Sequence, residues 1–132
     1  MSVPSPTGHD LFALLWATLA DIMGTAATAM LLRRAARRAA ADVPELEQLV
    51  ISREGLEYGY AVPATWRQGQ EGRSRAALRA LVHELGPLLV DLTGPIVVGR
   101  LQELEPLLDA GVVSIEEVAA WLKAQPQNPY SA

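Results

Sequence analysis

The chain of 132 residues contains no cysteine. It therefore forms no disulfide, offers no thiolate to a metal ion, and has no cysteine nucleophile. Aromatic residues make up only 5% of the sequence, whereas hydrophobic residues make up 50%. Leucine, valine and alanine must fill most of the interior, and leucine and alanine favour helices. These absences predict a cytoplasmic protein with a mostly helical core.

A surplus of positive charge is also absent. The formal net charge is -4 and the pI is about 5.1, whereas nucleic-acid binding needs an overall or strongly localised positive field. No lysine or arginine precedes Leu11, so the positive region of a signal peptide is missing. Leu11–Leu32 has the length of a membrane span, but Asp21 at its centre would cost about 2.5–3.5 kcal/mol there. We therefore expect neither nucleic acid nor a membrane as a partner.

The sequence also lacks the motifs of common enzymes and metal sites. It contains neither a Gly-x-Ser-x-Gly nucleophile elbow nor a phosphate-binding Gly-Lys-Ser/Thr loop. His83 lies opposite the leucine side of its predicted helix, and no second metal ligand stands at helical spacing from it. We expect an exposed His83, no metal, no cofactor and no catalytic residue. An enzyme would need Asp21, His83 or Glu84 to converge in one cleft.

A chain of this length is expected to form one domain. Residues 1–8 contain two prolines and a glycine and predict a flexible N-terminus. Residues 125–132 also contain two prolines and predict a flexible tail. The single domain therefore covers residues 9–124, and we find no internal repeat within it.

The segment Leu11–Arg38 has the apolar periodicity of one long helix. Thr7 and Asp10 resemble a capping box with Asp in place of Glu, which places the start of the helix near Gly8. At 100° per residue, the bulky side chains gather on one side, which should face the core. These side chains are Phe12, Leu15, Trp16, Leu19, Ile22, Met23 and Met30.

A second stripe of this helix consists of small residues at heptad spacing. Small side chains allow another helix to approach closely. That helix is either the chain's own helix beginning at Ser74 or the same helix of a second copy, which would form an isologous interface. We expect a homo-oligomer, because the stripe needs more cover than the chain supplies. The predicted oligomer interface consists of Ala13, Ala17, Ala20, Gly24 and Ala27.

A third stripe carries Thr18, Asp21, Thr25 and Thr28 and no lysine or glutamate. A solvent-exposed helix face is normally rich in long charged side chains. Short hydroxyl side chains suggest a partly buried stripe, in which threonines bond to their own helix. The stripe is therefore either a covered packing surface or the polar lining of a small-ligand site with Asp21 as its charged member.

The end of the long helix carries four arginines: Arg33, Arg34, Arg37 and Arg38. On the helical wheel, the first three fall on the core-facing side. One interpretation is that they pair with acidic residues nearby and with the negative end of the helix dipole. The other is a binding site for a phosphate, a carboxylate or an acidic protein partner, because arginine recognises such anions in a bidentate way. Candidate intramolecular partners are Glu45, Glu47, Glu54 and Glu57.

A β-hairpin is predicted at about residues 48–62. Apolar and polar or small residues alternate strictly from Leu56 to Val62, which indicates a strand with one buried face. Glu54-Gly55 forms a plausible two-residue turn between strands 48–54 and 56–62. Because a lone hairpin is only marginally stable in water, it must pack on the helices or on another chain.

The remaining sequence predicts helices that are interrupted by Gly-Pro pairs. A leucine-faced helix begins at Ser74 and is kinked at Gly86-Pro87, and a new helix begins at Pro95 and ends at Gly111. Ser114 and Glu117 form the capping box of a last helix. The segment Leu104–Leu122 resembles a short helix pair found at the C-terminal ends of many bacterial proteins, a resemblance that implies no function.

The predicted fold is mostly α (α+β), with a long N-terminal helix, one β-hairpin, and a helical bundle broken at Gly-Pro pairs. The predicted function is a non-enzymatic regulatory or protein-interaction module that oligomerises through its first helix. The alternative is a sensor domain that binds a small anionic or aromatic ligand between the first helix and the hairpin. Its pocket would be lined by Trp16, Asp21, Arg34, Tyr58 and Tyr60.

Overall fold

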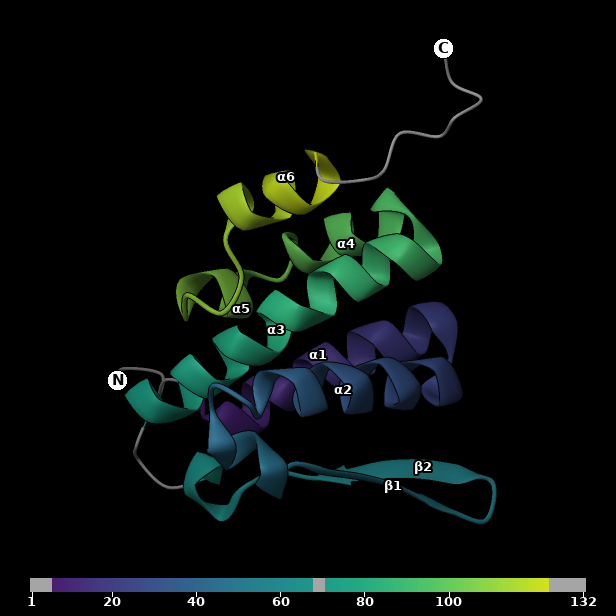
Figure 1. Ribbon diagram of the computed structural model, residues 1–132, viewed down its shortest axis with the longest axis vertical. Helices are drawn as coiled ribbons and strands as arrows, with labels where there is room; N and C mark the ends of the chain where they lie inside the picture. The colour runs from purple at the N-terminus through teal and green to yellow at the C-terminus, as the bar shows by residue number, and fades with distance from the viewer. Residues whose placement is uncertain (1–5, 68–70, 124–132) are drawn as a thin grey trace, which may run out of the picture.

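The computed structural model describes residues 6–67 and 71–123. These residues form a mostly helical structure with one two-stranded hairpin between the N-terminal and the later helices (Figure 1), so the predicted fold class is confirmed. Residues 1–5 of the predicted flexible N-terminus and all of the predicted tail lie outside the described residues. The elements are α1 (Gly8–Met23), α2 (Thr25–Ala39), η1 (Pro44–Gln48), β1 (Val50–Glu54), β2 (Glu57–Ala61), η2 (Ala64–Arg67), α3 (Glu71–Thr93), α4 (Pro95–Leu101), α5 (Glu105–Asp109) and α6 (Ile115–Lys123).

The prediction of one long first helix is wrong, because Gly24 divides it into α1 and α2. Gly24 has φ 86° and ψ 162°, a combination that is almost confined to glycine. Its N–H still closes α1 by donating to the Ala20 carbonyl, and its own carbonyl accepts the Thr28 hydroxyl at 2.8 Å. The chain therefore turns back at Gly24, and α2 lies antiparallel beside α1 (Figure 1).

The break also removes the continuous small stripe on which the predicted oligomer interface depended. Ala17 borders a surface groove beside Arg100, whereas Ala27 borders a different groove beside Tyr58. None of the five small residues is fully buried. The premise of that interface is therefore wrong, while oligomerisation itself stays a prediction. The residues concerned are Ala13, Ala17, Ala20, Gly24 and Ala27.

A second pair of helices joined by a glycine corner, α3–α4, lies further along the chain. Gly94 separates the second pair with backbone angles close to those of Gly24, φ 75° and ψ −164°. Both glycines follow an exposed Asp and an exposed aliphatic residue, in Asp21-Ile22 and Asp91-Leu92. The fold therefore contains two helix–glycine–helix units, while the expectation of no internal repeat in the sequence stays a prediction. Matching buried leucines are Leu11, Leu15 and Leu19 in the first unit and Leu81, Leu85 and Leu89 in the second.

The core lies where these two units meet. α2 packs most extensively against α3, and both helices also contact α1. Small side chains on the buried side of α2 permit this close approach. The predicted leucine face of α3 is buried except for Leu92 at its end, which is 54% exposed. The buried small residues of α2 are Ala29, Ala35, Ala36 and Ala39.

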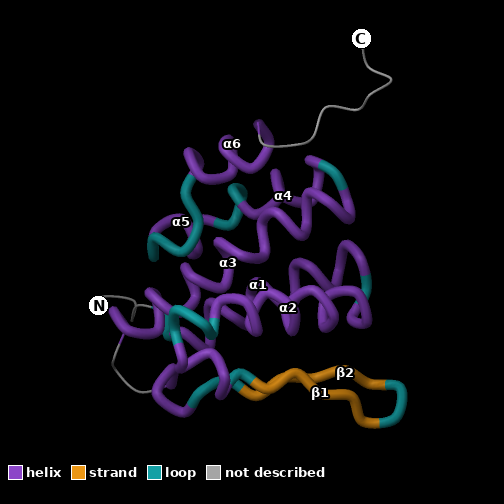
Figure 2. Tube along the Cα trace, in the orientation of Figure 1, coloured by secondary structure: helices purple, strands orange, loops and turns teal. Residues whose placement is uncertain are grey.

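The hairpin lies along the α1–α2 pair (Figure 2), with the register Ile51↔Tyr60 and Glu54↔Glu57. Its two-residue turn is Gly55-Leu56 rather than the predicted Glu54-Gly55. Gly55 has φ 62°, and glycine at the first central position is typical of a type II′ turn. The prediction of a hairpin at this place is confirmed, but each strand is shorter than predicted.

The α1–α2 corner, the α3–α4 corner and the hairpin turn lie toward the same end of the molecule (Figure 1). α3 continues through Pro87, whereas α4 begins at Pro95 as predicted. The prediction of a single helix from Pro95 to Gly111 is wrong, because residues 102–104 divide it into α4 and α5; Pro106, which lacks an N–H, stands in the first turn of α5. The predicted end at Gly111 is confirmed, because Gly111 has φ 75° and donates to the Leu108 carbonyl after α5. Ser114 likewise accepts the Glu117 N–H at the start of α6.

Candidate functional site

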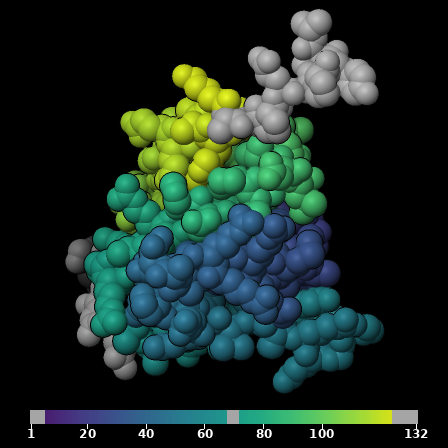
Figure 3. Space-filling model, in the orientation of Figure 1, coloured from purple at the N-terminus to yellow at the C-terminus, as the bar shows by residue number. Residues whose placement is uncertain are grey.

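Four arginines form the exposed side of α2, and we call them the basic face: Arg33, Arg34, Arg37 and Arg38. The opposite side of α2 is buried against the core, so the prediction that Arg33, Arg34 and Arg37 share the core-facing side is wrong. That prediction assumed a continuous helix, whereas Gly24 resets the helical phase. Met30 is 57% exposed and lies one turn before Arg34 on the same side. α2 crosses the middle of the surface in Figure 3.

The predicted ion pairs between the basic face and nearby glutamates are absent from the described part of the chain. Glu45 is buried, accepts the Thr65 hydroxyl at 2.7 Å, and lies 3.5 Å from Arg73 Nε. Glu54 and Glu57 stand on the hairpin face opposite to Ile51, which packs inward. The arginines therefore have no carboxylate partner within residues 6–67 and 71–123.

One arginine of the basic face also has a structural role. Arg33 donates from Nη2 to the Ile51 carbonyl at 2.8 Å. In the register of this hairpin, the backbone groups of Ile51 point away from β2, so that the carbonyl is open to a side chain. Arg33 thus ties the outer edge of β1 to α2, while Arg34, Arg37 and Arg38 have no such contact in the described residues.

A surface groove of about 620 Å³ borders the basic face. Its floor is apolar, and Arg33, Arg34 and Arg37 supply positive charge along it. Tyr58 of β2 closes the side toward the hairpin. We call this the basic groove, and its apolar lining consists of Ala26, Ala27, Ala29 and Met30.

The predicted ligand pocket between the first helix and the hairpin does not form as one cavity. Trp16 and Tyr60 do meet, with ring centroids 5.0 Å apart, but Phe12 and Trp66 complete a packed cluster around them. Burial raises the pKa of the Tyr60 hydroxyl, with the charge of Arg67 acting in the opposite direction. This cluster fastens the hairpin to α1 and leaves Tyr60 neutral at physiological pH.

The other members of that predicted pocket lie apart. Tyr58 borders the basic groove together with Arg34. Asp21 borders a separate groove of about 460 Å³, opposite the Arg100–Glu103 ion pair. The predicted polar stripe is likewise dispersed: Thr18 borders the Asp21 groove, Thr28 is buried, and Thr25 is exposed.

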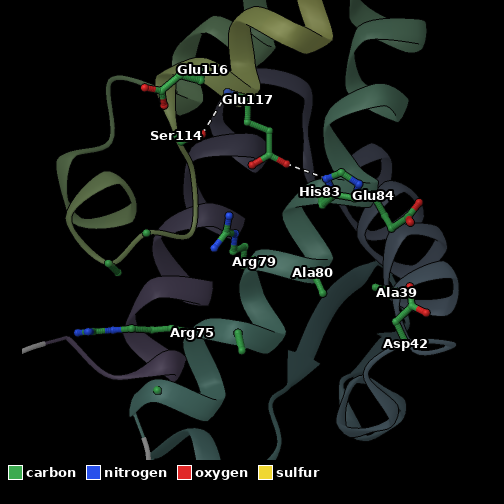
Figure 4. Close-up of a pocket in the computed structure, with 14 residues that line it drawn as sticks. Ala39, Asp42, Arg75, Arg79, Ala80, His83, Glu84, Ser114, Glu116 and Glu117 are labelled. Atoms are coloured by element: carbon green, nitrogen blue, oxygen red, sulfur yellow. Dashed lines mark hydrogen bonds and ion pairs between the residues drawn. The ribbon is translucent and has the colours of Figure 1, made fainter.

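A larger open groove of about 880 Å³ lies between the end of α2, α3 and the segment that leads into α6. We call it the α3 groove (Figure 4). Arg75, Arg79 and His83 stand at successive helical turns on one side of α3, and each borders the groove. The lining carries both signs of charge, because it also includes four acidic residues: Asp42, Glu84, Glu116 and Glu117.

The α3 groove contains a contact that the sequence analysis missed. His83 Nδ1 lies 2.9 Å from Glu117 Oε1, and the His83 side chain is 70% exposed, as predicted. Glu117 was expected to complete the capping box with Ser114. Only half of that box forms, because the Glu117 carboxylate turns to His83 instead (Figure 4). Nothing local in the sequence indicates a partner this far along the chain.

The candidate catalytic residues do not converge. His83 and Glu84 border the α3 groove, whereas Asp21 borders the groove beside Arg100. Residues 6–67 and 71–123 contain no group of three or more His, Asp or Glu side chains placed to hold a metal ion. Within the same residues, no helix is both long and apolar enough to span a bilayer.

No protein-family model, no curated protein and no solved structure matches this chain. Any proposal about its function therefore depends on the surfaces described above.

Proposed function

We propose that this protein is a non-enzymatic interaction module that binds an acidic protein partner through the basic face of α2. The observation that supports the proposal is the exposure of these arginines without a carboxylate partner in the described residues. A chain with a net charge of -4 has many carboxylates available for intramolecular pairing. The fold instead directs its densest positive charge outward.

The apolar floor of the basic groove supports a protein partner rather than a free ion. Met30 and the neighbouring alanines offer surface that an apolar side chain can cover. Exposed ion pairs contribute little individually, about 0–1 kcal/mol each. Burial of apolar surface between arginines would supply affinity, and the charges would supply selectivity and fast association.

The test uses a fluorescein-labelled peptide in which leucine alternates with glutamate, measured by fluorescence anisotropy. Arg34→Glu/Arg37→Glu should weaken its binding at least about tenfold, because two attractive contacts become repulsive. Arg33 is left intact because it holds β1. Raising the salt to about 1 M, where the Debye length is about 3 Å, should also weaken binding.

The matched control is Arg100→Glu/Lys123→Glu, which changes the net charge equally at exposed positions in α4 and α6, outside both the basic groove and the α3 groove. It should bind the acidic peptide within about twofold of the unchanged chain, since screening limits distant charges. A version of the peptide with lysine in place of glutamate should not bind. If both double variants lost peptide binding equally, the loss would follow from the change in net charge, and a binding site on α2 would be contradicted.

The α3 groove favours a second candidate function, a sensor of a small anionic ligand. Arg75, Arg79 and His83 border one large hollow beside the Ser114 hydroxyl. Inorganic phosphate and citrate are suitable probes in a thermal-shift assay, because a ligand stabilises the folded state by RT ln(1+[L]/Kd). Arg79→Glu should abolish the shift, and Arg34→Glu/Arg37→Glu should leave it unchanged. The absence of a shift with either anion would exclude both probes as ligands.

A further inference from the structure

We propose that the acidic partner of the basic groove is the hairpin turn of a second copy of this chain. We call Glu54, Gly55, Leu56 and Glu57 the hairpin tip. This inference rests on the proposed function, because it identifies the partner of the same surface. It replaces the oligomer interface expected on one long helix with a different surface.

The hairpin tip has the features of an inserted element. Leu56 is 88% exposed, the highest value among the exposed large hydrophobic residues of the described chain. It occupies the second position of the two-residue turn, at the end of a hairpin whose base is fixed to α1 and α2. An exposed leucine on a tightly defined turn costs little conformational entropy when it binds.

The two negative charges of the hairpin tip are not neutralised by a positive charge of the same hairpin. Glu54 and Glu57 are directly opposed across the two strands, and such like-charge pairs destabilise a hairpin. Arg53 is adjacent but does not neutralise them: its Nε donates to the Gly55 carbonyl at 2.7 Å, and its guanidinium lies over the Tyr58 ring. Positive charge from outside the hairpin would relieve this repulsion.

The basic groove matches the tip in chemistry. The tip presents Leu56 between the carboxylates of Glu54 and Glu57. The basic groove presents an apolar surface of alanine and methionine beside arginines, so the apolar and charged parts of the two surfaces are complementary. A chain's own tip cannot fill its own groove in this way. Glu54 and Glu57 stand on the hairpin face away from the helices, whereas Tyr58 on the inward face borders the groove.

The position of the two surfaces favours a closed dimer. Tyr58 belongs to the basic groove and is separated from Leu56 by a single residue, so tip and groove are neighbours on the molecule. A two-fold axis between them allows each tip to enter the partner's groove. Such an isologous contact is formed twice and leaves neither surface open for further growth.

The test measures the mass of the full chain by sedimentation velocity over a range of protein concentrations. The unchanged chain should form a dimer that dissociates as the salt is raised to about 1 M. The groove variant Arg34→Glu/Arg37→Glu and the tip variant Glu54→Lys/Glu57→Lys should each be monomeric. An equimolar mixture of the two should restore a dimer, because both of its groove–tip contacts are again complementary.

A third variant tests the apolar part of the contact. Leu56→Ser should raise the dimer dissociation constant at least about tenfold, since burial of a leucine side chain is lost. The matched control Leu92→Ser removes another exposed leucine and should leave dimerisation unchanged. Circular dichroism should show that all variants remain folded, because every changed residue is exposed.

Several outcomes would overturn the proposal. They are a monomeric unchanged chain at all concentrations, a dimer that survives in the groove or tip variant, and a mixture of these variants that stays monomeric. The acidic-peptide assay separates the two proposals. A monomeric chain that still binds the peptide through Arg34 and Arg37 would reject the second copy as partner and retain the interaction module.

Discussion

The two helix–glycine–helix units share a backbone design but differ in the surfaces that they present. α1 and α2 join at Gly24, and α3 and α4 join at Gly94, with closely similar backbone angles. After this common corner, α2 continues for 15 residues and ends in four arginines, whereas α4 stops after 7 residues. The buried leucines define the shared architecture, and the exposed helix face distinguishes the unit that we propose to bind a partner.

The two units also differ in the tryptophan contacts of their first helices. Trp16 of α1 points outward from its own helix and packs on Tyr60 of the hairpin. The matching position in α3 is Gly86, where an added Cβ would overlap the ring of Trp121. In the first unit, a tryptophan of α1 therefore packs on the hairpin, whereas in the second unit a tryptophan of α6 packs on α3.

The largest expected effect tests whether the two units share one core. Leu15→Ala and Leu85→Ala should each lower the free energy of unfolding by about 2–5 kcal/mol, because each side chain is at most 1% exposed. Urea denaturation followed by circular dichroism measures this loss. Leu92→Ala is the exposed control and should stay within about 0.5 kcal/mol of the unchanged chain. Two separate unfolding transitions in either variant would show that the units are independent.

A somewhat smaller effect is expected where the two units differ. Gly86→Ala should destabilise the protein by about 1–3 kcal/mol, because the new methyl group overlaps the Trp121 ring. Urea denaturation followed by circular dichroism measures the loss. The double variant Gly86→Ala/Trp121→Leu replaces the indole ring by a smaller side chain and should recover part of the lost stability. An additive double variant would mean that the two residues do not interact.

The features that the sequence predicted well are those with local causes. The capping box of Thr7 and Asp10 starts α1 at Gly8, and Pro95 starts α4, because each depends on neighbouring residues alone. The hairpin was also predictable from its alternation. Its turn was misplaced by one residue, since both Glu54-Gly55 and Gly55-Leu56 place glycine within the loop.

The break at Gly24 was not predictable from periodicity. Glycine within a helix costs only about 1 kcal/mol relative to alanine, so a helical pattern on both sides fits either outcome. Packing of α2 on α3 decides the outcome, and the phase of every residue after Gly24 changes with it. That change moves Arg33, Arg34 and Arg37 from the expected core side to the surface. The His83–Glu117 contact was equally hidden, because it joins residues from two distant helices.

The corner glycines provide the next test of the comparison. Gly24→Ala and Gly94→Ala should each cost about 1–3 kcal/mol, because their positive φ angles disfavour a side chain. An added Cβ meets nothing within 4 Å at either position, so the cost is conformational and should be similar in both units. Thermal denaturation measures the loss. Gly99→Ala in α4 is the control: it also has free space, and alanine in a helix is neutral or stabilising there.

The smallest expected effect concerns the start of each unit. The Thr7 backbone N–H donates to Asp10 at 3.0 Å, and this bond holds the pKa of the Asp10 carboxyl below its usual value. The matching residue in the second unit, Ala80, lies inside α3 and needs no cap. Asp10 therefore contributes stability above its unfolded pKa of about 3.9, and that contribution is lost as the pH falls through the lower folded value.

Asp10→Asn should remove this contribution and leave the rest of the pH dependence unchanged. Because Asp10 is exposed, the loss at pH 7 should be only a few tenths of a kcal/mol, about 0.5 at most. Urea denaturation at neutral pH and at a series of pH values below about 3.9 measures it, and the difference between the two chains should shrink as the pH falls. A constant difference at all of these pH values would assign the effect to the geometry of the cap rather than to its charge. The first unit would then depend on hydrogen bonding alone at the end where the second unit simply continues its helix.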